Sequence, residues 1–359
     1  MEYFKKYHSN TTAGSGSQYF FINESDKPTK SCTLYRVSEG GEYPYSFLIS
    51  NTIDGTFADG KISHKNLVVD SWVIDKMQVG VSSRCDKDSF AYPVSMKAVT
   101  FDGKAEKNVN PGELFCTDPV ILNAKAGEYI CVEITFSGKM IPNHEESMIP
   151  SFILKDGEWV ASKKHPYLAM LGADLGDKQK IAYLGDSITQ GCGTPVNSYT
   201  HWNAVLSERL GNKYSYWNIG LGYGRADDAA SDGMWLYKAK QNDIVFVCYG
   251  VNDINRGFSA DAIKKNLQTI VDKLCERGIR VFIQTVPPFN YPPERTVIWK
   301  EVNEFIKNEI QNVEFVFDCT AILSKSEEEP QMAKYGGHPD SNGCKIWGEA
   351  LYDAVKDVL

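Results

Sequence analysis

Hydrophobic and polar positions alternate in short runs along the first half of the chain. The runs are rich in β-branched and aromatic residues, and Gly, Asn, Asp and Pro separate them. Strands that arrive about every ten residues, with no helical pattern between them, predict an antiparallel β-sandwich or jelly roll. Residues 139–166 lose this periodicity and gain proline and polar residues, which predicts a connecting segment. The predicted strands lie at residues 43–50, 66–75, 76–83, 93–101, 118–124 and 129–138.

The pattern changes near residue 180, where short apolar runs begin to alternate with longer amphipathic stretches. Strand and helix in alternation predict a parallel sheet with helices on both faces. With 359 residues, we expect two domains, residues 1–175 and residues 176–359. The apolar runs lie at residues 181–185, 214–220, 243–250, 280–288 and 313–318, and the amphipathic stretches at residues 199–210, 260–277, 296–309 and 341–358. One apolar helix face is predicted for Ile263, Leu267, Ile270, Val271 and Leu274.

Composition and charge narrow the classes of function. The net charge is −8, and no long run of Lys or Arg offers the positive surface that nucleic acid requires. We therefore expect no nucleic-acid partner. The first lysines are not followed by the apolar core of a secretory signal, and no run approaches the roughly 18 apolar residues of a membrane span. We expect a cytoplasmic protein with no membrane partner, and no pattern indicates an oligomeric state.

The nine cysteines are scattered from Cys32 to Cys344 without paired spacing, and several, such as Cys131 and Cys248, lie in apolar runs. Buried free thiols in a reducing compartment explain this distribution better than a disulfide framework or a zinc site. The six histidines are equally dispersed, with no HExxH spacing. We expect neither a metal nor a cofactor.

The stretch IAYLGDSITQGCG, residues 181–193, ends a predicted buried strand in Gly-Asp-Ser. Ser187 then lies at the carboxyl end of a strand, where open α/β sheets bind their ligands. Two interpretations fit this serine. It is either a nucleophile or the N-cap of a helix, because Ser and Asp accept hydrogen bonds from the free N–H groups of a first turn.

Three further loops follow predicted strands of the second half. They contain, in order, Gly220, Gly222 and Gly224; then Gly250, Asn252 and Asp253; and finally His338. In a parallel sheet these loops gather at the same edge as Ser187. A serine with a base in reach, and N–H groups aimed at a developing oxyanion, are what acyl transfer needs. The nucleophile hypothesis explains all of these loops, whereas the N-cap hypothesis explains only one.

These residues resemble the SGNH (GDSL) hydrolase family over roughly residues 178–359. The matching blocks are Gly185-Asp186-Ser187, Asn218 with Gly220, Gly250 to Asp253, and His338-Pro339 with Gly343. The resemblance implies a flavodoxin-like parallel sheet with helices on both faces. It also implies that Ser187 is the nucleophile and His338 the base. The oxyanion hole would consist of the Ser187 N–H, an N–H of the glycine block and the Asn252 side chain.

Two positions depart from the family pattern. The oxyanion glycine is expected five positions after Asn218, where this chain has Tyr223, and we predict that its neighbour Gly222 supplies the N–H. The family's usual Asp lies three positions before the histidine, where this chain has Tyr335. Such an acid orients the imidazole and stabilises its charged form. Either a backbone carbonyl replaces it, or Asp340 or Asp318 does, and we favour a Ser–His dyad.

Other residues have supporting roles in this hypothesis. Asp186 and Asp253 are predicted to be hydrogen-bond acceptors that hold their loops rather than catalytic acids. The proline-rich segment after the fourth strand forbids regular structure, and Phe289, Tyr291 and Arg295 within it could line a substrate cleft. Tyr223 and Tyr335 are further candidates for supporting or lining residues.

The sequence thus predicts a serine esterase that removes short acyl groups, above all acetyl, from a carbohydrate. The substrate class follows from resemblance alone, because carbohydrate esterase family two also has a jelly roll before an SGNH domain. The substrate would be a small-molecule or oligosaccharide ester. Two alternatives stay open. One is a hydrolase of lipid-type esters or thioesters; the other is a non-catalytic carbohydrate-binding protein with a degenerate hydrolase domain, which Tyr335 keeps in consideration.

Overall fold

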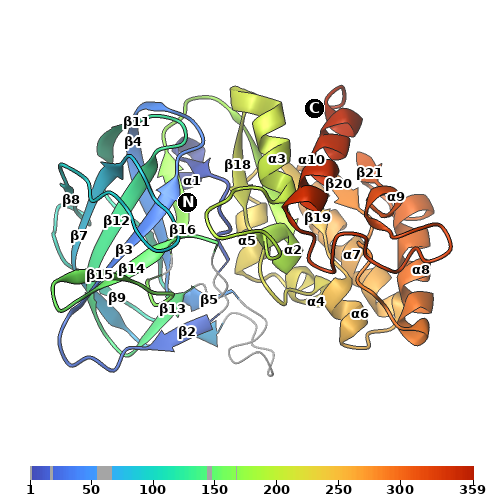
Figure 1. Ribbon diagram of the computed structural model, residues 1–359, viewed down its shortest axis with the longest axis horizontal. Helices are drawn as coiled ribbons and strands as arrows, with labels where there is room; N and C mark the ends of the chain where they lie inside the picture. Colours follow the sequence, from blue (N-terminus) through green and yellow to red (C-terminus); the bar gives the residue numbers. More distant parts are fainter. Residues whose placement is uncertain (1, 17–18, 55–66, 144–147, 167) are drawn as a thin grey trace. The chain divides into compact units, whose positions relative to one another are not determined.

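The computed structural model describes residues 2–16, 19–54, 67–143, 148–166 and 168–359. Its contacts divide the chain into two compact units, whose elements are labelled in Figure 1. Unit 1 comprises residues 1–178 and 215–217, and is built of β-strands apart from the short helix α1 (Tyr3–Lys6). Unit 2 comprises residues 179–214 and 218–359, and alternates strands with helices. The predicted succession of a β-rich part and an α/β part is confirmed.

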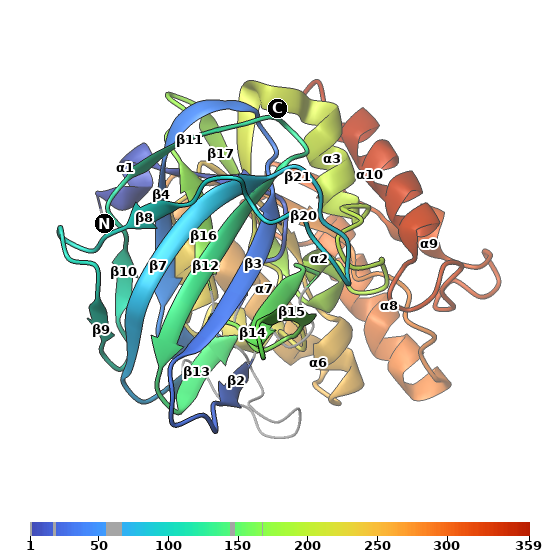
Figure 2. The ribbon, with the colours of Figure 1, turned by 60° about the vertical axis from the view of Figure 1, so that its left-hand side comes forward.

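Two antiparallel sheets form most of unit 1, and Figure 2 shows β7, β12 and β3 of the first sheet side by side. The strand order is β15-β14-β3-β12-β7-β8 in this sheet, with β9 paired to β7. In the second sheet β4 pairs with β10, β11 and β16, and β16 pairs with β1. The short strands β2 and β13 pair with each other, as do β5 and β6.

The strands of unit 1 are β1 (His8–Thr11), β2 (Tyr19–Ile22), β3 (Thr29–Arg36), β4 (Gly41–Ser50), β5 (Thr52–Ile53), β6 (Leu67–Val68), β7 (Trp72–Ser82), β8 (Lys97–Val99), β9 (Lys107–Val109), β10 (Leu114–Cys116), β11 (Val120–Ala124), β12 (Tyr129–Ser137), β13 (Met140–Asn143), β14 (Ser151–Lys155), β15 (Glu158–Ala161) and β16 (Leu168–Ala173). The predicted strands at residues 43–50, 118–124 and 129–138 coincide with β4, β11 and β12, and β8 occupies part of the strand predicted at residues 93–101. The predicted break between residues 75 and 76 is wrong, because β7 runs through it. Part of the strand predicted at residues 66–75 lies outside the described residues.

The segment 139–166 is not the connecting segment that the sequence predicted, because it contains β13, β14 and β15. Strands β14 and β15 form a hairpin in which Lys155 pairs with Glu158. Between them, Asp156 and Gly157 have φ values of 51° and 86°. A two-residue hairpin turn needs positive φ at both positions, which Asp-Gly tolerates well. The Asp-Gly pair was therefore a usable signal, but the polar surroundings concealed it.

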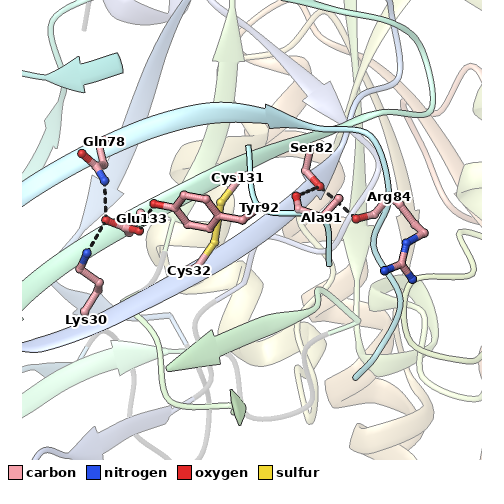
Figure 3. Close-up of a disulfide and its surroundings, with 9 residues drawn as sticks. All are labelled: Lys30, Cys32, Gln78, Ser82, Arg84, Ala91, Tyr92, Cys131 and Glu133. Carbon is pink, nitrogen blue, oxygen red and sulfur yellow. Dashed lines mark hydrogen bonds and ion pairs between the residues drawn. A yellow bond between two sulfur atoms is a disulfide. The ribbon is translucent and has the colours of Figure 1, made fainter. Parts of the chain in front are cut away.

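A disulfide joins Cys32 of β3 to Cys131 of β12 (Figure 3). The two strands are antiparallel neighbours, and the Cα atoms of the two cysteines are 6.3 Å apart. The prediction that the cysteines are free thiols is wrong for this pair. Each lies in an apolar strand, and the pairing depends on strand register that spacing along the chain does not reveal. The cytoplasmic location, which drew on cysteine usage, stays a prediction.

Beside the disulfide, the carboxylate of Glu133 is buried within the same sheet (Figure 3). It accepts hydrogen bonds of 2.6 Å from Gln78 and 2.8 Å from the Tyr92 hydroxyl, and Lys30 lies 2.9 Å away. A buried charge is tolerated when it is paired and hydrogen-bonded. This carboxylate has such partners, which offset the cost of its burial.

Unit 2 is built around a parallel sheet whose central strands are buried. The order is β17 (Gln179–Gly185), β19 (Ile244–Cys248), β20 (Arg280–Gln284) and β21 (Phe315–Phe317). Every residue of β19 is buried, which is the pattern of a strand covered by helices on both sides. The parallel α/β sheet predicted from the alternation is confirmed, as is the flavodoxin-like class that the family resemblance implies.

Amphipathic helices cover this sheet. Helix α7 buries the predicted apolar face, since all five of its predicted core residues are 0% exposed. The helices of unit 2 are α2 (Ser187–Gln190), α3 (Trp202–Leu210), α4 (Ala226–Ala230), α5 (Met234–Ala239), α6 (Val251–Asn255), α7 (Ala260–Cys275), α8 (Pro293–Asn308), α9 (Thr320–Leu323) and α10 (Ser341–Val355), with a short 3₁₀ turn at Gly211–Lys213. No helix within the described ranges is both long and apolar enough to cross a lipid bilayer.

Strand β18 (Tyr214–Asn218) contributes residues to each unit. Its residues 215–217 group with unit 1, where Tyr216 and Trp217 pair in parallel with Asn10 and Thr11 of β1. Strand β1 was not predicted, because its residues, His-Ser-Asn-Thr, are polar. All four are nevertheless buried, since β1 also pairs with β16.

Candidate active site

Strand β17 leads directly into the short helix that carries Ser187. The strand ends at Gly185, and α2 begins at Ser187. Asp186 occupies the N-cap position, where its carboxylate accepts a hydrogen bond of 2.9 Å from the Ile188 N–H. The interpretation of Ser187 as an N-cap is therefore wrong. Asp186 caps the helix, and Ser187 is its first helical residue.

Glycines allow the neighbouring loops to approach α2 closely. A Cβ atom at Gly220 would lie 2.3 Å from the nitrogen of Gln190, and one at Gly193 would lie 2.6 Å from the carbonyl oxygen of Pro339. Gly193 also has a φ of 99°, which side chains rarely adopt. The second glycine-rich turn after the strand thus lets the loop of His338 pack against the chain beyond α2.

The Ser187 hydroxyl lies 2.8 Å from Nε2 of His338, although 151 positions separate the two residues. Ser187 is 8% exposed, whereas His338 is exposed. The ring of Phe289 meets the imidazole edge to face, with the ring centroids 5.4 Å apart. A hydroxyl within hydrogen-bond reach of an imidazole is the arrangement that activates a serine as a nucleophile.

The loop before His338 is joined to the loop that follows β20. The Asn290 N–H donates to the carbonyl of Gln331 at 3.0 Å, and its side-chain oxygen accepts from the Ala333 N–H at 2.9 Å. These bonds keep Phe289 close to the imidazole. Asn290 has a φ of 56°, in the left-handed region that Asn tolerates. Nothing else in the sequence indicated that this residue joins the two loops.

The glycine block forms a tight turn beside the end of β17. The Leu221 N–H donates to the carbonyl of Gly185 at 3.0 Å, and the Gly224 N–H donates to the carbonyl of Leu221 at 3.0 Å. Gly222 and Tyr223 are the central residues, and Tyr223 has a φ of 58°. Among the described residues, the Gly222 N–H donates to no backbone carbonyl.

The two polar residues of the GxND block contact the same turn from α6. The Asn252 side chain donates to the carbonyl of Gly224 at 3.0 Å. Asp253 is fully buried, and both of its carboxylate oxygens contact the Ala226 N–H, at 3.1 and 3.0 Å. The structure thus brings Asn252 and Asp253 to the segment that carries Gly222.

Two buried carboxyl groups flank the nucleophile and this turn. Burial raises the pKa of Asp186 to about 7, and the charge of Asp253 adds to the rise although the Ile188 N–H opposes it. Burial likewise raises the pKa of Asp253 to about 7, against the effect of its bond from the Ala226 N–H. Neither group touches His338 in the bonds described above, so their geometry is that of loop supports.

Asp340 and Asp318, the two candidates for a third catalytic member, hold other parts of the chain. The Asp340 carboxylate caps α10 by accepting a 2.8 Å hydrogen bond from the Gly343 N–H. The Asp318 carboxylate accepts from the Thr320 N–H at 3.0 Å. Each acid thus has a structural use at the start of a helix.

The remaining predicted lining residues are divided between the surface and the core. Tyr335 is half-buried, and the ammonium group of Lys334 lies 5.3 Å from its ring centroid. Tyr291 is 3% exposed, so it lies in the core rather than on a cleft wall. Arg295 donates to the side chain of Asn255 at 3.2 Å. Among the residues that the structure describes, no three His, Cys, Asp or Glu side chains are grouped to hold a metal ion.

A pair of buried asparagines holds α2 in place. The Asn203 and Asn218 side chains both donate to the carbonyl of Thr189, at 2.6 and 3.0 Å. The Asn218 oxygen in turn accepts from the Gly220 N–H at 3.0 Å. Asn218 belongs to a recognisable block, but nothing in the sequence marked Asn203, because a polar residue on a helix is ordinarily solvated.

Comparison with known proteins gives one family match and several similar solved structures. Residues 183–346 match the model of the GDSL-like lipase/acylhydrolase family. The curated proteins contain no match. Among solved structures, a putative lipolytic protein of the G-D-S-L family from Desulfitobacterium hafniense is 21% identical and covers 49% of this chain and 99% of its own, with a TM-score of 0.40.

Two further structures have similar scores. The esterase EstA from Pseudoalteromonas sp. is 17% identical and covers 50% of this chain and 98% of its own, with a TM-score of 0.39. A family two carbohydrate esterase from Clostridium thermocellum is 14% identical and covers 98% of both chains, with a TM-score of 0.40. Because these scores are low, the assignment depends on the family match and its motifs.

A parallel α/β sheet with GDS, GxND and histidine blocks at one edge defines an acyl hydrolase. The part of the chain that matches the family model, residues 183–346, is a GDSL-like acylhydrolase domain, and the protein is an esterase of the SGNH type.

Substitution of Gly220 by Ala should destabilise unit 2, because the new Cβ would meet the backbone of α2 rather than a flexible side chain. Overpacking of this kind costs about 1–3 kcal/mol. Urea unfolding of Gly220→Ala and of the wild type would measure the difference. A change below about 0.5 kcal/mol, within the range of an ordinary surface substitution, would contradict the close approach.

Because the pKa of Asp186 is raised, we expect the free energy of unfolding to depend on pH. The folded state binds the proton more tightly than the unfolded state, where the pKa is about 3.9. The contribution to stability is therefore full below about pH 4 and is lost as the pH rises to about 7. Asp186→Asn can still cap Ile188 but does not titrate. Urea unfolding between pH 4 and 8 should show a smaller fall in stability for the variant, and parallel profiles would contradict the prediction.

Proposed function

We propose that this esterase hydrolyses short-chain acyl esters, above all acetyl esters of a carbohydrate, by a Ser–His mechanism. The observation that carries the mechanism is the 2.8 Å hydrogen bond between the Ser187 hydroxyl and Nε2 of His338. It also weighs against a degenerate, non-catalytic domain, because a disused site has no reason to keep this pair aligned.

In the first half of the reaction, the Ser187 oxygen attacks the ester carbonyl carbon while His338 takes the hydroxyl proton. The tetrahedral intermediate then collapses, and the alcohol leaves with the proton from His338. In the second half, water attacks the acyl-enzyme as His338 takes a proton from it. The acid is released, and the histidine returns the proton to Ser187.

The proposed mechanism requires donors for the negative charge of the tetrahedral intermediate. We assign the N–H groups of Ser187 and Gly222 and the side chain of Asn252 to this oxyanion hole. The Asn252 amide has two hydrogens, of which one is used by the carbonyl of Gly224. The other serves the substrate. Donors fixed before the reaction lower the barrier without reorganisation.

The proposed histidine partner is a backbone carbonyl rather than a carboxylate. Asp340 and Asp318 are each engaged at the start of a helix, at α10 and at Thr320. Tyr335 stands where the family usually has the acid, and its side chain carries a phenol in place of the carboxylate. A dyad is therefore the simplest mechanism for these residues.

The carbohydrate ester is proposed because the chain has a β-rich unit before its hydrolase unit, the same plan as carbohydrate esterase family two. The proposed partner is a small-molecule or oligosaccharide ester. A lipid-type ester or thioester is the competing substrate class, and the chain length of the preferred acyl group distinguishes the two.

Hydrolysis of nitrophenyl acetate, butyrate and octanoate by the purified protein would test the proposal. We expect the highest kcat/KM for acetate and a loss of at least about 10³-fold in Ser187→Ala, because the nucleophile is gone. A serine-directed phosphonate should add one label to the wild type and none to the variant, as measured by intact mass. Preference for octanoate would favour the lipid-type class, and no hydrolysis of any ester would favour the non-catalytic alternative.

The dyad makes a separate prediction about the acids. His338→Ala should be nearly inactive, whereas Asp340→Asn and Asp318→Asn should each keep kcat within about threefold of the wild type. Both Asn side chains can still accept the helix N–H bonds, so the fold is preserved. Loss of a triad acid can cost about 10⁴-fold in kcat. A loss of about 10³-fold or more in either Asn variant would therefore establish a triad and overturn the dyad.

A further inference from the structure

The last two residues of the GxND block, Asn252 and Asp253, both form side-chain hydrogen bonds to one short segment of backbone. Asn252 donates to the carbonyl of Gly224 at 3.0 Å, and Asp253 accepts from the Ala226 N–H through both carboxylate oxygens. The two bonds lie on either side of Arg225. Neighbouring residues of α6 thus hold both the carbonyl and the N–H side of the same stretch.

This stretch is the end of the turn that presents the Gly222 N–H. At its start, the turn is joined to β17 by the 3.0 Å bond from the Leu221 N–H to the carbonyl of Gly185. At its end, the Ala226 N–H is the first of α4 and has the buried carboxylate of Asp253 as its acceptor. The turn is therefore anchored at both ends, and Asp253 is one of the anchors.

The turn needs such anchoring because its backbone is strained. Tyr223 has a φ of 58°, a conformation that is costly for a residue with a side chain. Strain of this kind persists only where the surroundings impose it. Asp253 is 0% exposed, and burial raises its pKa. Burial of this carboxyl group therefore costs free energy, which its hydrogen bond to the Ala226 N–H offsets.

We propose that Asp253 is a positioning residue that holds the Gly222 N–H in the oxyanion hole through its bond with the Ala226 N–H. The inference deepens the proposed esterase mechanism and depends on it for its catalytic consequence. Asp253 itself does not touch the substrate. Its contribution is to the donor geometry that the transition state uses, so it acts on kcat more than on KM.

Two variants of Asp253 separate this role from the charge of the carboxylate. Asp253→Ala removes the acceptor of the Ala226 N–H, whereas Asp253→Asn keeps an oxygen that can accept the same bond. Asp243→Ala is the matched control, because its carboxylate also accepts a backbone hydrogen bond, from Lys180 at 2.8 Å, but at the beginning of β17. All three are made in the full chain and compared with the wild type.

In steady-state hydrolysis of nitrophenyl acetate, we expect kcat to fall at least tenfold in Asp253→Ala, with KM changed by less than about threefold. Asp253→Asn should restore kcat to within about threefold of the wild type, and Asp243→Ala should leave it unchanged within about twofold. If Asp253→Ala keeps kcat within threefold, or if Asp253→Asn is as impaired as Asp253→Ala, the inference is overturned.

Hydrogen–deuterium exchange on the protein without substrate tests the same inference independently of activity. Exchange over residues 221–226 should be at least tenfold faster in Asp253→Ala than in the wild type, and unchanged in Asp253→Asn and Asp243→Ala. Unchanged exchange in Asp253→Ala would overturn the positioning role. If the wild type hydrolyses no ester, the proposed function fails, but the exchange result still decides whether Asp253 anchors the turn. Should Asp253→Ala fail to fold, the folded Asp253→Asn variant still tests the inference. Faster exchange over residues 221–226 in that variant than in the wild type would overturn it.

Discussion

Ser187 and His338 meet because two stretches of backbone touch at a place where a side chain has no room. A Cβ at Gly193 would lie 2.6 Å from the carbonyl oxygen of Pro339 and 2.8 Å from that of His338. The hydrogen bond of the catalytic pair depends on this approach, since the histidine lies on an exposed loop that no regular element fixes. The bonds of Asn290 to residues 331 and 333 restrain the same loop from its other side.

Buried amides and carboxylates hold the other loops of the site. The first N–H groups and the last carbonyls of a helix have no partner within the helix and need others. The carbonyl of Thr189 finds them in two asparagine side chains, and the Ala226 N–H finds one in Asp253. These polar contacts have directions, unlike apolar packing, so they fix the orientation of donors as well as the position of the chain. The raised pKa values of Asp186 and Asp253 are the cost of placing acceptors in a dry interior.

Unit 1 illustrates where local patterns are sufficient and where they fail. Alternation identified strands such as β7 and β12, because a half-buried strand shows its two faces in sequence. It failed for β1, whose four polar residues are buried by pairing on both edges. It failed again for β14 and β15, where turn chemistry at Asp156 was the better guide. The Cys32–Cys131 pair depends on strand register, which no spacing rule specifies.

The sequence by itself determined the α/β class of unit 2, the buried face of α7 and the four blocks that identify the family, because these are short-range patterns of residue type. It also marked Ser187, Asn252 and His338 as a set, since each follows a strand of a parallel sheet. Only the tertiary structure decided that Asp186, not Ser187, caps α2, and that Tyr291 is in the core. It also decided that Asn203 holds α2 and that the Ala226 N–H is the partner of Asp253. The physical reason is that the role of a buried polar side chain depends on its hydrogen-bond partner. That partner is often distant in sequence, so only the packing of the chain determines it.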